Sequence, residues 1–90
     1  MEYILAIEYV EEVIYKLKAQ KEEITLKNLE DNLNILLNKN KEIIIAYAKV
    51  AFANIIQNTD KVTAKNMEAE IQNLKKLFTN EKIIEIANKI

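Results

Sequence analysis

The sequence predicts an all-α fold, a small bundle of about five helices built from two αα-hairpin repeats and a terminal helix. Apolar residues recur at intervals of three and four along most of the chain, which is the period of an amphipathic helix. Half of the 90 residues are apolar and 30% are charged, which is typical of a globular domain. The chain contains no Gly and no Pro, so its eleven Asn residues are expected to form the turns and caps. We expect a single helical domain of residues 1–90.

The first predicted helix covers residues 2–19. One stripe of apolar residues runs along it with steps of four, three, four and three: Tyr3, Ile7, Val10, Ile14 and Leu17. Glutamates lie in its first part and lysines near its end, which complements the helix dipole. Residues 20–23 carry no apolar residue and are expected to form a connection.

The second and fourth helices are predicted from their start signals. Thr25 is the expected N-cap of a helix over residues 25–37, and Thr63 is the expected N-cap of a helix over residues 63–78. Each threonine is preceded by an apolar residue and followed, four residues after it, by another, as in a hydrophobic staple. The pairs are Ile24 with Leu29, and Val62 with Met67.

The segment Asn38-Lys39-Asn40 is predicted to separate the second helix from the third. A continuous helix would place Asn40 within an apolar face, which lowers stability. With a break at residues 38–40, Asn40 becomes an N-cap, and Asn80 is expected to fill the equivalent position later in the chain. The third and fifth helices are then predicted over residues 41–58 and 81–90.

Two segments of the sequence resemble each other, which predicts an internal repeat of about residues 24–50 and 62–90. The stretch ITLKNLE at 24–30 and the stretch VTAKNME at 62–68 share four identical positions at an offset of 38. Asn40 and Asn80 continue the match at an offset of 40, so one loop or helix is expected to be two residues longer.

The third predicted helix is unusually apolar. Twelve of the seventeen residues from Lys41 to Gln57 are apolar, so this helix is expected either at the centre of the bundle or in an oligomer interface. The first helix also carries apolar residues outside its stripe. This surplus predicts a homodimer, with six residues as the candidate interface: Ile4, Leu5, Tyr9, Ile45, Phe52 and Ile56.

Composition argues against an enzyme. The chain has no Cys and no His, which removes thiolate chemistry, the commonest general base and the commonest transition-metal ligand. Without Gly it cannot form a Gly-rich phosphate loop. Lys49 lies on the mostly apolar third helix, and snorkelling of its amine to the surface is the expected arrangement. We therefore expect no catalytic, metal-binding or cofactor-binding residues and no cofactor.

Nucleic-acid binding is a less favoured alternative, because all thirteen basic residues are Lys and the net charge is −1. Residues 24–49 resemble a helix-turn-helix, which implies a second helix with a polar face for the major groove. The stretch DKVTAKNMEAEI at 60–71 is similar to the last loop and helix of an archaeal histone. That resemblance implies a DNA-wrapping dimer with one long middle helix running through Asn38 and Asn40.

A third resemblance concerns MEYILA at 1–6 together with EITLKNLEDNL at 23–33. These segments resemble the N-terminal dimerisation region of the acidic ribosomal stalk protein of archaea. The resemblance implies a helical homodimer that binds a protein helix.

The sequence thus predicts a non-enzymatic module for protein–protein interaction or dimerisation. A phage or viral inhibitor, or a bacteriocin immunity protein, is a further alternative of the same size and composition. The chain starts without a basic signal region and has no run long enough to span a bilayer, so a cytoplasmic location without membrane contact is expected. Abundant Ile and Lys without Arg indicate an AT-rich genome.

Overall fold

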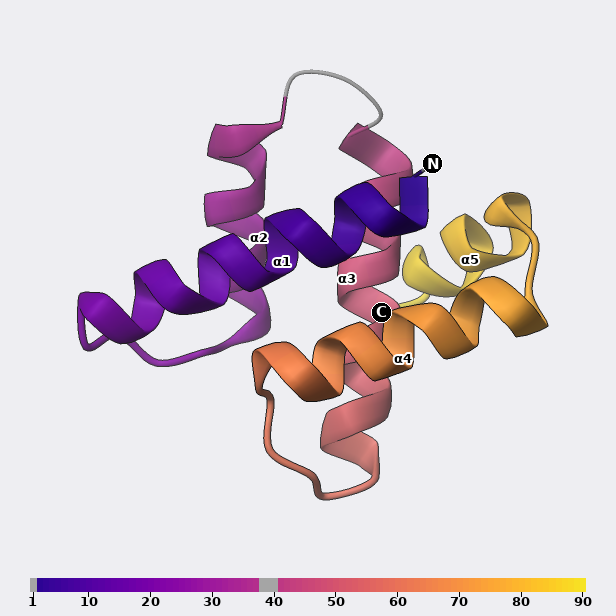
Figure 1. Ribbon diagram of the computed structural model, residues 1–90. Coiled ribbons are helices and arrows are strands. Elements are labelled where there is room, and N and C mark those ends of the chain that lie inside the picture. Colours follow the sequence, from indigo (N-terminus) through magenta and orange to yellow (C-terminus); the bar gives the residue numbers. More distant parts are fainter. Residues whose placement is uncertain (1, 38–40) are drawn as a thin grey trace.

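The computed structural model describes residues 2–37 and 41–90, and this part of the chain is all-helical (Figure 1). The predicted fold class is confirmed, and the predicted helix ends agree with the observed ones to within three residues. Five helices lie in the described residues: α1 (Glu2–Ala19), α2 (Leu26–Leu36), α3 (Lys41–Gln57), α4 (Ala64–Leu77) and α5 (Asn80–Ala87).

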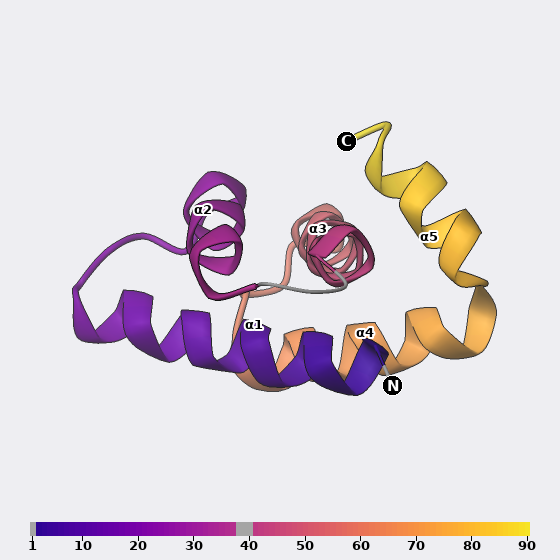
Figure 2. The same cartoon turned by 90° about the horizontal axis from the view of Figure 1, so that it is seen from above.

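The helices form two layers (Figure 2). Helices α1 and α4 lie side by side in one layer, and α2, α3 and α5 form the other. The molecule measures 34 × 32 × 21 Å, and its smallest dimension equals about two helix diameters of ~10 Å. Helix α3 contacts each of the other four helices. It is the central helix, which is one of the two positions predicted from its composition.

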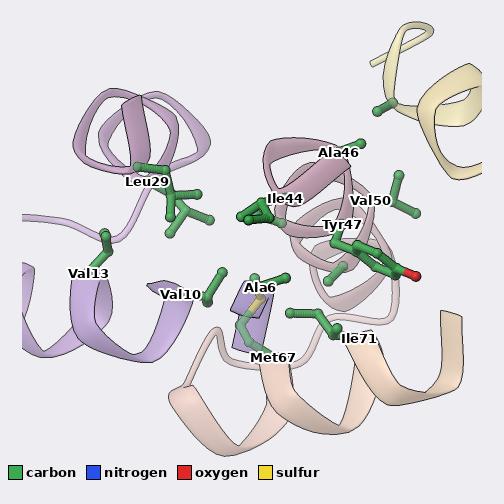
Figure 3. Close-up of a cluster of buried hydrophobic side chains, with 14 of the residues drawn as sticks. Ala6, Val10, Val13, Leu29, Ile44, Ala46, Tyr47, Val50, Met67 and Ile71 are labelled. Atoms are coloured by element: carbon green, nitrogen blue, oxygen red, sulfur yellow. The ribbon is translucent and has the colours of Figure 1, made fainter. Parts of the chain in front are cut away.

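The core is built around α3, which contributes the largest share of the buried side chains (Figure 3). Tyr47 and Ile44 are each 1% exposed and meet α1 and α4 at Ala6 and Met67. Each fully buried aliphatic or aromatic side chain stabilises the fold by about 1.5–3 kcal/mol relative to an exposed one. The buried residues of α3 are Ile43, Ile44, Ala46, Tyr47, Ala48, Val50, Ala51 and Ile55.

The predicted N-caps of α2 and α4 are confirmed. The Thr25 hydroxyl accepts a hydrogen bond from the backbone N–H of Asn28 at 3.1 Å, and Thr63 accepts one from Asn66 at 3.1 Å. Both asparagine side chains donate to a loop carbonyl five residues earlier, at 2.9 and 2.8 Å. One of the four backbone donors left free at each helix start is thereby satisfied, and the same local pattern occurs at both helices.

The ends of α1 and α3 are also alike. Lys21 and Thr59 have positive φ angles of 58° and 59°, and the next residue donates its backbone N–H back to Leu17 and Ile55 at 2.9 and 3.0 Å. This is the Schellman arrangement, in which a left-handed residue closes the helix. The expectation that Asn would supply the left-handed turns is wrong for the described residues, because a lysine and a threonine occupy them.

The two connections therefore follow the same course 38 residues apart, and the helices around them correspond as well. Adding 38 to the buried residues Ala6, Val10, Val13 and Leu17 of α1 gives four buried residues of α3. Exchanging α1 with α3 and α2 with α4 also reproduces the helix contacts: α1–α2 becomes α3–α4, and α1–α4 becomes α3–α2. The two hairpins are thus related by an approximate two-fold operation that exchanges the layers.

This structural correspondence includes α1, which lies before the predicted internal repeat of residues 24–50 and 62–90. The repeat itself remains a prediction. Helix α4 has 14 residues and α2 has 11, so the two corresponding helices differ in length by three residues.

Helices α2 and α3 are separate. Helix α2 ends at Leu36, Leu37 has an extended backbone (φ −92°, ψ 130°), and α3 begins at Lys41. The predicted break at 38–40 and the predicted cap at Asn40 lie outside the described residues. The single long middle helix that the histone resemblance implies does not form.

The predicted N-cap of the last helix is wrong by one residue. Thr79, not Asn80, caps α5, and its hydroxyl accepts a hydrogen bond from the backbone N–H of Lys82 at 3.2 Å. Asn80 is the first helical residue, and its amide is used in tertiary contacts. It accepts from the Tyr47 hydroxyl at 3.3 Å and donates to Glu2 Oε1 at 3.2 Å.

Candidate functional site

A groove lies on the face of the molecule opposite α1 and α4. It has a volume of about 400 Å³ and lies between α2, α3 and α5. Its apolar part comes from Ile45 and Ala46 of α3 and Ile84 and Ala87 of α5. Its polar lining residues are Glu30, Lys41, Glu42, Lys49 and Asn88. Two acidic and two basic side chains leave this groove without a net charge.

Beyond the groove, α3 carries two further apolar residues, Phe52 and Ile56, on the face that holds Ile45 and Lys49. Ile45, Phe52 and Ile56 are spaced by seven and four residues, so they share one face of the helix. Ile45 and Phe52 are half-buried against the core, and Ile56 is 52% exposed. The three candidate interface residues predicted on the third helix therefore lie on one surface that its own chain covers only in part. We call this surface the α3 stripe.

The three candidate interface residues of α1 lie elsewhere. Ile4 is 42% exposed, and Leu5 and Tyr9 are half-buried. None of them lines the groove, and α1 belongs to the other layer (Figure 2). The structure thus divides the six predicted residues between two surfaces.

Lys49 lines the groove wall on α3, four residues after Ile45. Its side chain is half-buried. A snorkelling lysine covers apolar surface with its aliphatic stem and keeps its amine in water, and a half-buried side chain is compatible with that expectation.

The most enclosed polar side chain near the core is that of Tyr47. Burial, with a smaller contribution from the negative charge of Glu2, raises the pKa of Tyr47 above its ordinary value of 10.0. Its hydroxyl stays neutral at physiological pH and is hydrogen-bonded to Asn80. This arrangement ties α3 to α5, and through Glu2 to α1, so its role is structural.

Among the described residues, no cluster of three or more Asp or Glu side chains is arranged to hold a metal ion. Within the same part of the chain, none of the helices is long and apolar enough to cross a membrane.

Sequence reasoning missed the contribution of α5 to the groove. The sequence predicts that Ile84 and Ala87 belong to the last helix. The spacing of apolar residues does not indicate which other helix these two residues contact. The signal that could have located them is the short length of α5, whose eight residues need a neighbouring helix for stability.

The fold and this surface define a small two-layer α-helical protein with a partly apolar groove. No protein-family model, no curated protein and no solved structure matches the chain.

Proposed function

We propose that this protein is a non-enzymatic interaction module that forms a homodimer through the α3 stripe. The observation that carries the proposal is that Ile45, Phe52 and Ile56 remain partly open along the central helix, next to a groove of about 400 Å³. An apolar surface that opens into a groove is the form in which helical proteins present themselves to a partner helix.

A second copy of the chain is the proposed partner because a two-fold dimer uses the same patch on both copies. The groove lining is charge-balanced, with Glu30 and Glu42 beside Lys41 and Lys49, so two copies can approach without repulsion between like charges. A single substitution in the stripe would then act twice in the dimer.

The DNA-binding alternatives receive less support. In a helix-turn-helix arrangement α3 would be the reading helix, yet eight of its seventeen residues are buried within the chain. A reading helix needs an exposed polar or basic face in the major groove. Salt-sensitive DNA binding in a low-salt gel-shift series would revive this alternative.

The proposed dimer is tested by molar mass. Size exclusion with light scattering over a concentration series is expected to give a dimer for the native chain. The substitution Ile56→Glu is expected to shift the mass to that of a monomer, because it places two carboxylates in the apolar interface.

Ile35→Glu is the matched control. Ile35 is an exposed isoleucine on α2, 72% exposed, and does not belong to the stripe or the groove. This variant is expected to remain dimeric. A native chain that is monomeric at all concentrations, or a dimer that persists in Ile56→Glu, would contradict the proposal.

A further inference from the structure

The approximate two-fold relation between the hairpins shows a difference between α1 and α3. Helix α3 buries four residues whose counterparts in α1, 38 positions earlier, are not fully buried. The four are Ile43, Ala46, Tyr47 and Val50, and the counterparts are Leu5, Glu8, Tyr9 and Glu12. Their spacing of three, one and three places each set on one face of its helix. We call the set Leu5, Glu8, Tyr9 and Glu12 the α1 face.

Helix α5 is what covers the corresponding face of α3. The Tyr47 hydroxyl donates to Asn80 of α5 at 3.3 Å, and Ala46 lines the same groove as Ile84 and Ala87. Figure 3 shows Ala46 and Val50 on the side of α3 that is turned toward α5. Between the described helices, the contact of α3 with α5 has no counterpart on α1.

We propose that the α1 face binds an amphipathic helix of a partner protein in the way that α5 packs on α3. Leu5 and Tyr9 correspond to Ile43 and Tyr47 of α3. The side chains of Leu5 and Tyr9 are half-buried, which leaves part of each free to contact an apolar residue of the partner. The neighbouring Ile4 is 42% exposed and extends the apolar surface.

The charges of α1 define the chemistry of this partner. Glu8 and Glu12 replace Ala46 and Val50 at the two equivalent positions, and both glutamates are exposed. Residues 2–15 contain four glutamates and no lysine. Neither Glu8 nor Glu12 takes part in the ion pairs of the described residues.

A helix that fits this face therefore carries apolar residues in its centre and Lys or Arg on its flanks. Pairing with the α1 face of a second copy would instead bring acidic side chains together, which is unfavourable. The partner is thus a basic amphipathic helix and not another copy of α1. This inference rests on the proposed function only in treating the chain as an interaction module, because its surface is distinct from the α3 stripe.

A peptide based on α5 tests the inference, since α5 is the helix that already fits the equivalent face. The probe is a synthetic peptide of residues 78–90 with Glu81→Lys and Glu85→Lys, which makes its flanks basic. It is titrated at low salt into the full-length, ¹⁵N-labelled protein, and amide shifts are followed by NMR. We expect saturable shifts at Leu5, Glu8, Tyr9 and Glu12, and weaker binding of the unsubstituted peptide.

The protein variant Glu8→Lys with Glu12→Lys should bind the basic peptide about tenfold more weakly, because two attractive charge pairs become repulsive. The matched control is Glu22→Lys with Glu23→Lys, which makes the same change in net charge at two exposed residues after the end of α1. The control should bind like the native chain.

Three results of the peptide titrations would overturn the inference: no shifts at millimolar peptide, equal weakening in the control, or shifts centred on Tyr47 and Val50. The last result would mean that the peptide displaces α5 from α3. Loss of self-association in Glu8→Lys with Glu12→Lys would assign the face to a second copy, which also overturns it. The Ile56→Glu chain should still bind the peptide. Failure of the proposed dimer through the α3 stripe can therefore be distinguished from failure of the proposed helix binding by the α1 face.

Discussion

At the residue scale, the contact of Tyr47 with Asn80 joins three helices at one point. The Tyr47 side chain is 1% exposed, and its hydroxyl finds a partner only because Asn80 begins α5 at this place. Asn80 in turn donates to Glu2 at the start of α1. A buried hydroxyl without a partner costs about 1–3 kcal/mol, so this contact limits where α5 can sit.

The raised pKa of Tyr47 predicts a loss of stability in alkaline solution. Below pH 10 the tyrosine is neutral in both the folded and the unfolded chain, and its titration does not affect stability. Above pH 10 the unfolded chain loses this proton while the folded chain retains it, so the free energy of unfolding falls as the pH rises toward the folded pKa. Urea unfolding at neutral pH and above pH 10 measures the effect.

The variant Tyr47→Phe isolates this contribution, because it lacks the titrating hydroxyl. It is expected to lose less stability than the native chain over the same rise in pH. Tyr15→Phe is the control, since the Tyr15 side chain is 59% exposed and takes no part in the contact between Tyr47 and Asn80. Equal pH dependence in the native chain and in Tyr47→Phe would show that Tyr47 does not contribute.

At the element scale, the local signals of the sequence were sufficient to place most helix ends. The hydroxyls of Thr25 and Thr63 each accept a hydrogen bond from the backbone N–H three residues later. Such contacts depend only on neighbouring residues in the sequence. The end of the chain was harder, because Thr79 and Asn80 are both good caps and lie next to each other. The choice between them is made by Tyr47 and Glu2, which are distant in the sequence.

The left-handed residues could not be predicted for a related reason. Asn was the expected occupant because its side chain tolerates a positive φ, yet Lys21 and Thr59 have φ angles of 58° and 59°. Each lies where the Schellman closure of the preceding helix requires such a residue. The number of residues between the helices sets this requirement, whatever the side chain.

Thr59→Gly is therefore expected to stabilise the protein. A β-branched residue in the left-handed region carries a strain of about 1–2 kcal/mol, which glycine does not. Part of the gain is offset by the greater chain entropy of glycine and by loss of the hydrogen bond from the Thr59 hydroxyl to the Asn58 carbonyl at 2.6 Å. We expect a net gain of about 0.5–1 kcal/mol in the free energy of unfolding, measured with urea.

Lys21→Gly provides the comparison at the equivalent turn. Lysine is not β-branched, so its strain and the gain on substitution should be smaller. If both substitutions lower the free energy of unfolding, the positive φ angles at Lys21 and Thr59 do not carry the expected strain.

At the scale of the whole molecule, the arrangement of α5 is what the sequence could not specify. The apolar period of residues 80–87 predicted a helix with a buried side, but not that α3 would supply the surface. Packing on α3 buries Ile43, Ala46, Tyr47 and Val50, so much of the apolar surplus that suggested a dimer is hidden within one chain. Of the six candidate interface residues, two remain exposed: Ile56 on the α3 stripe and Ile4 beside the α1 face.

The central position of α3 predicts that the protein unfolds as one cooperative unit. Because α3 contacts the other four helices, loss of α5 uncovers the helix on which the rest of the core is packed. Ile83 of α5 is 0% exposed, and Ile83→Ala is expected to cost about 2–5 kcal/mol. For a domain with a typical stability of 5–15 kcal/mol, this is a large fraction of the total.

Native-state hydrogen exchange can show how that loss is distributed. Under cooperative unfolding, the slowest amides of α1 and α3 lose the same amount of protection in Ile83→Ala as the global free energy falls. Ile86→Ala on the same helix is the matched control, because Ile86 is only half-buried and should cause a smaller loss. A loss of protection confined to α5 would instead show that this helix detaches by itself, and that the two hairpins hold α3 without it.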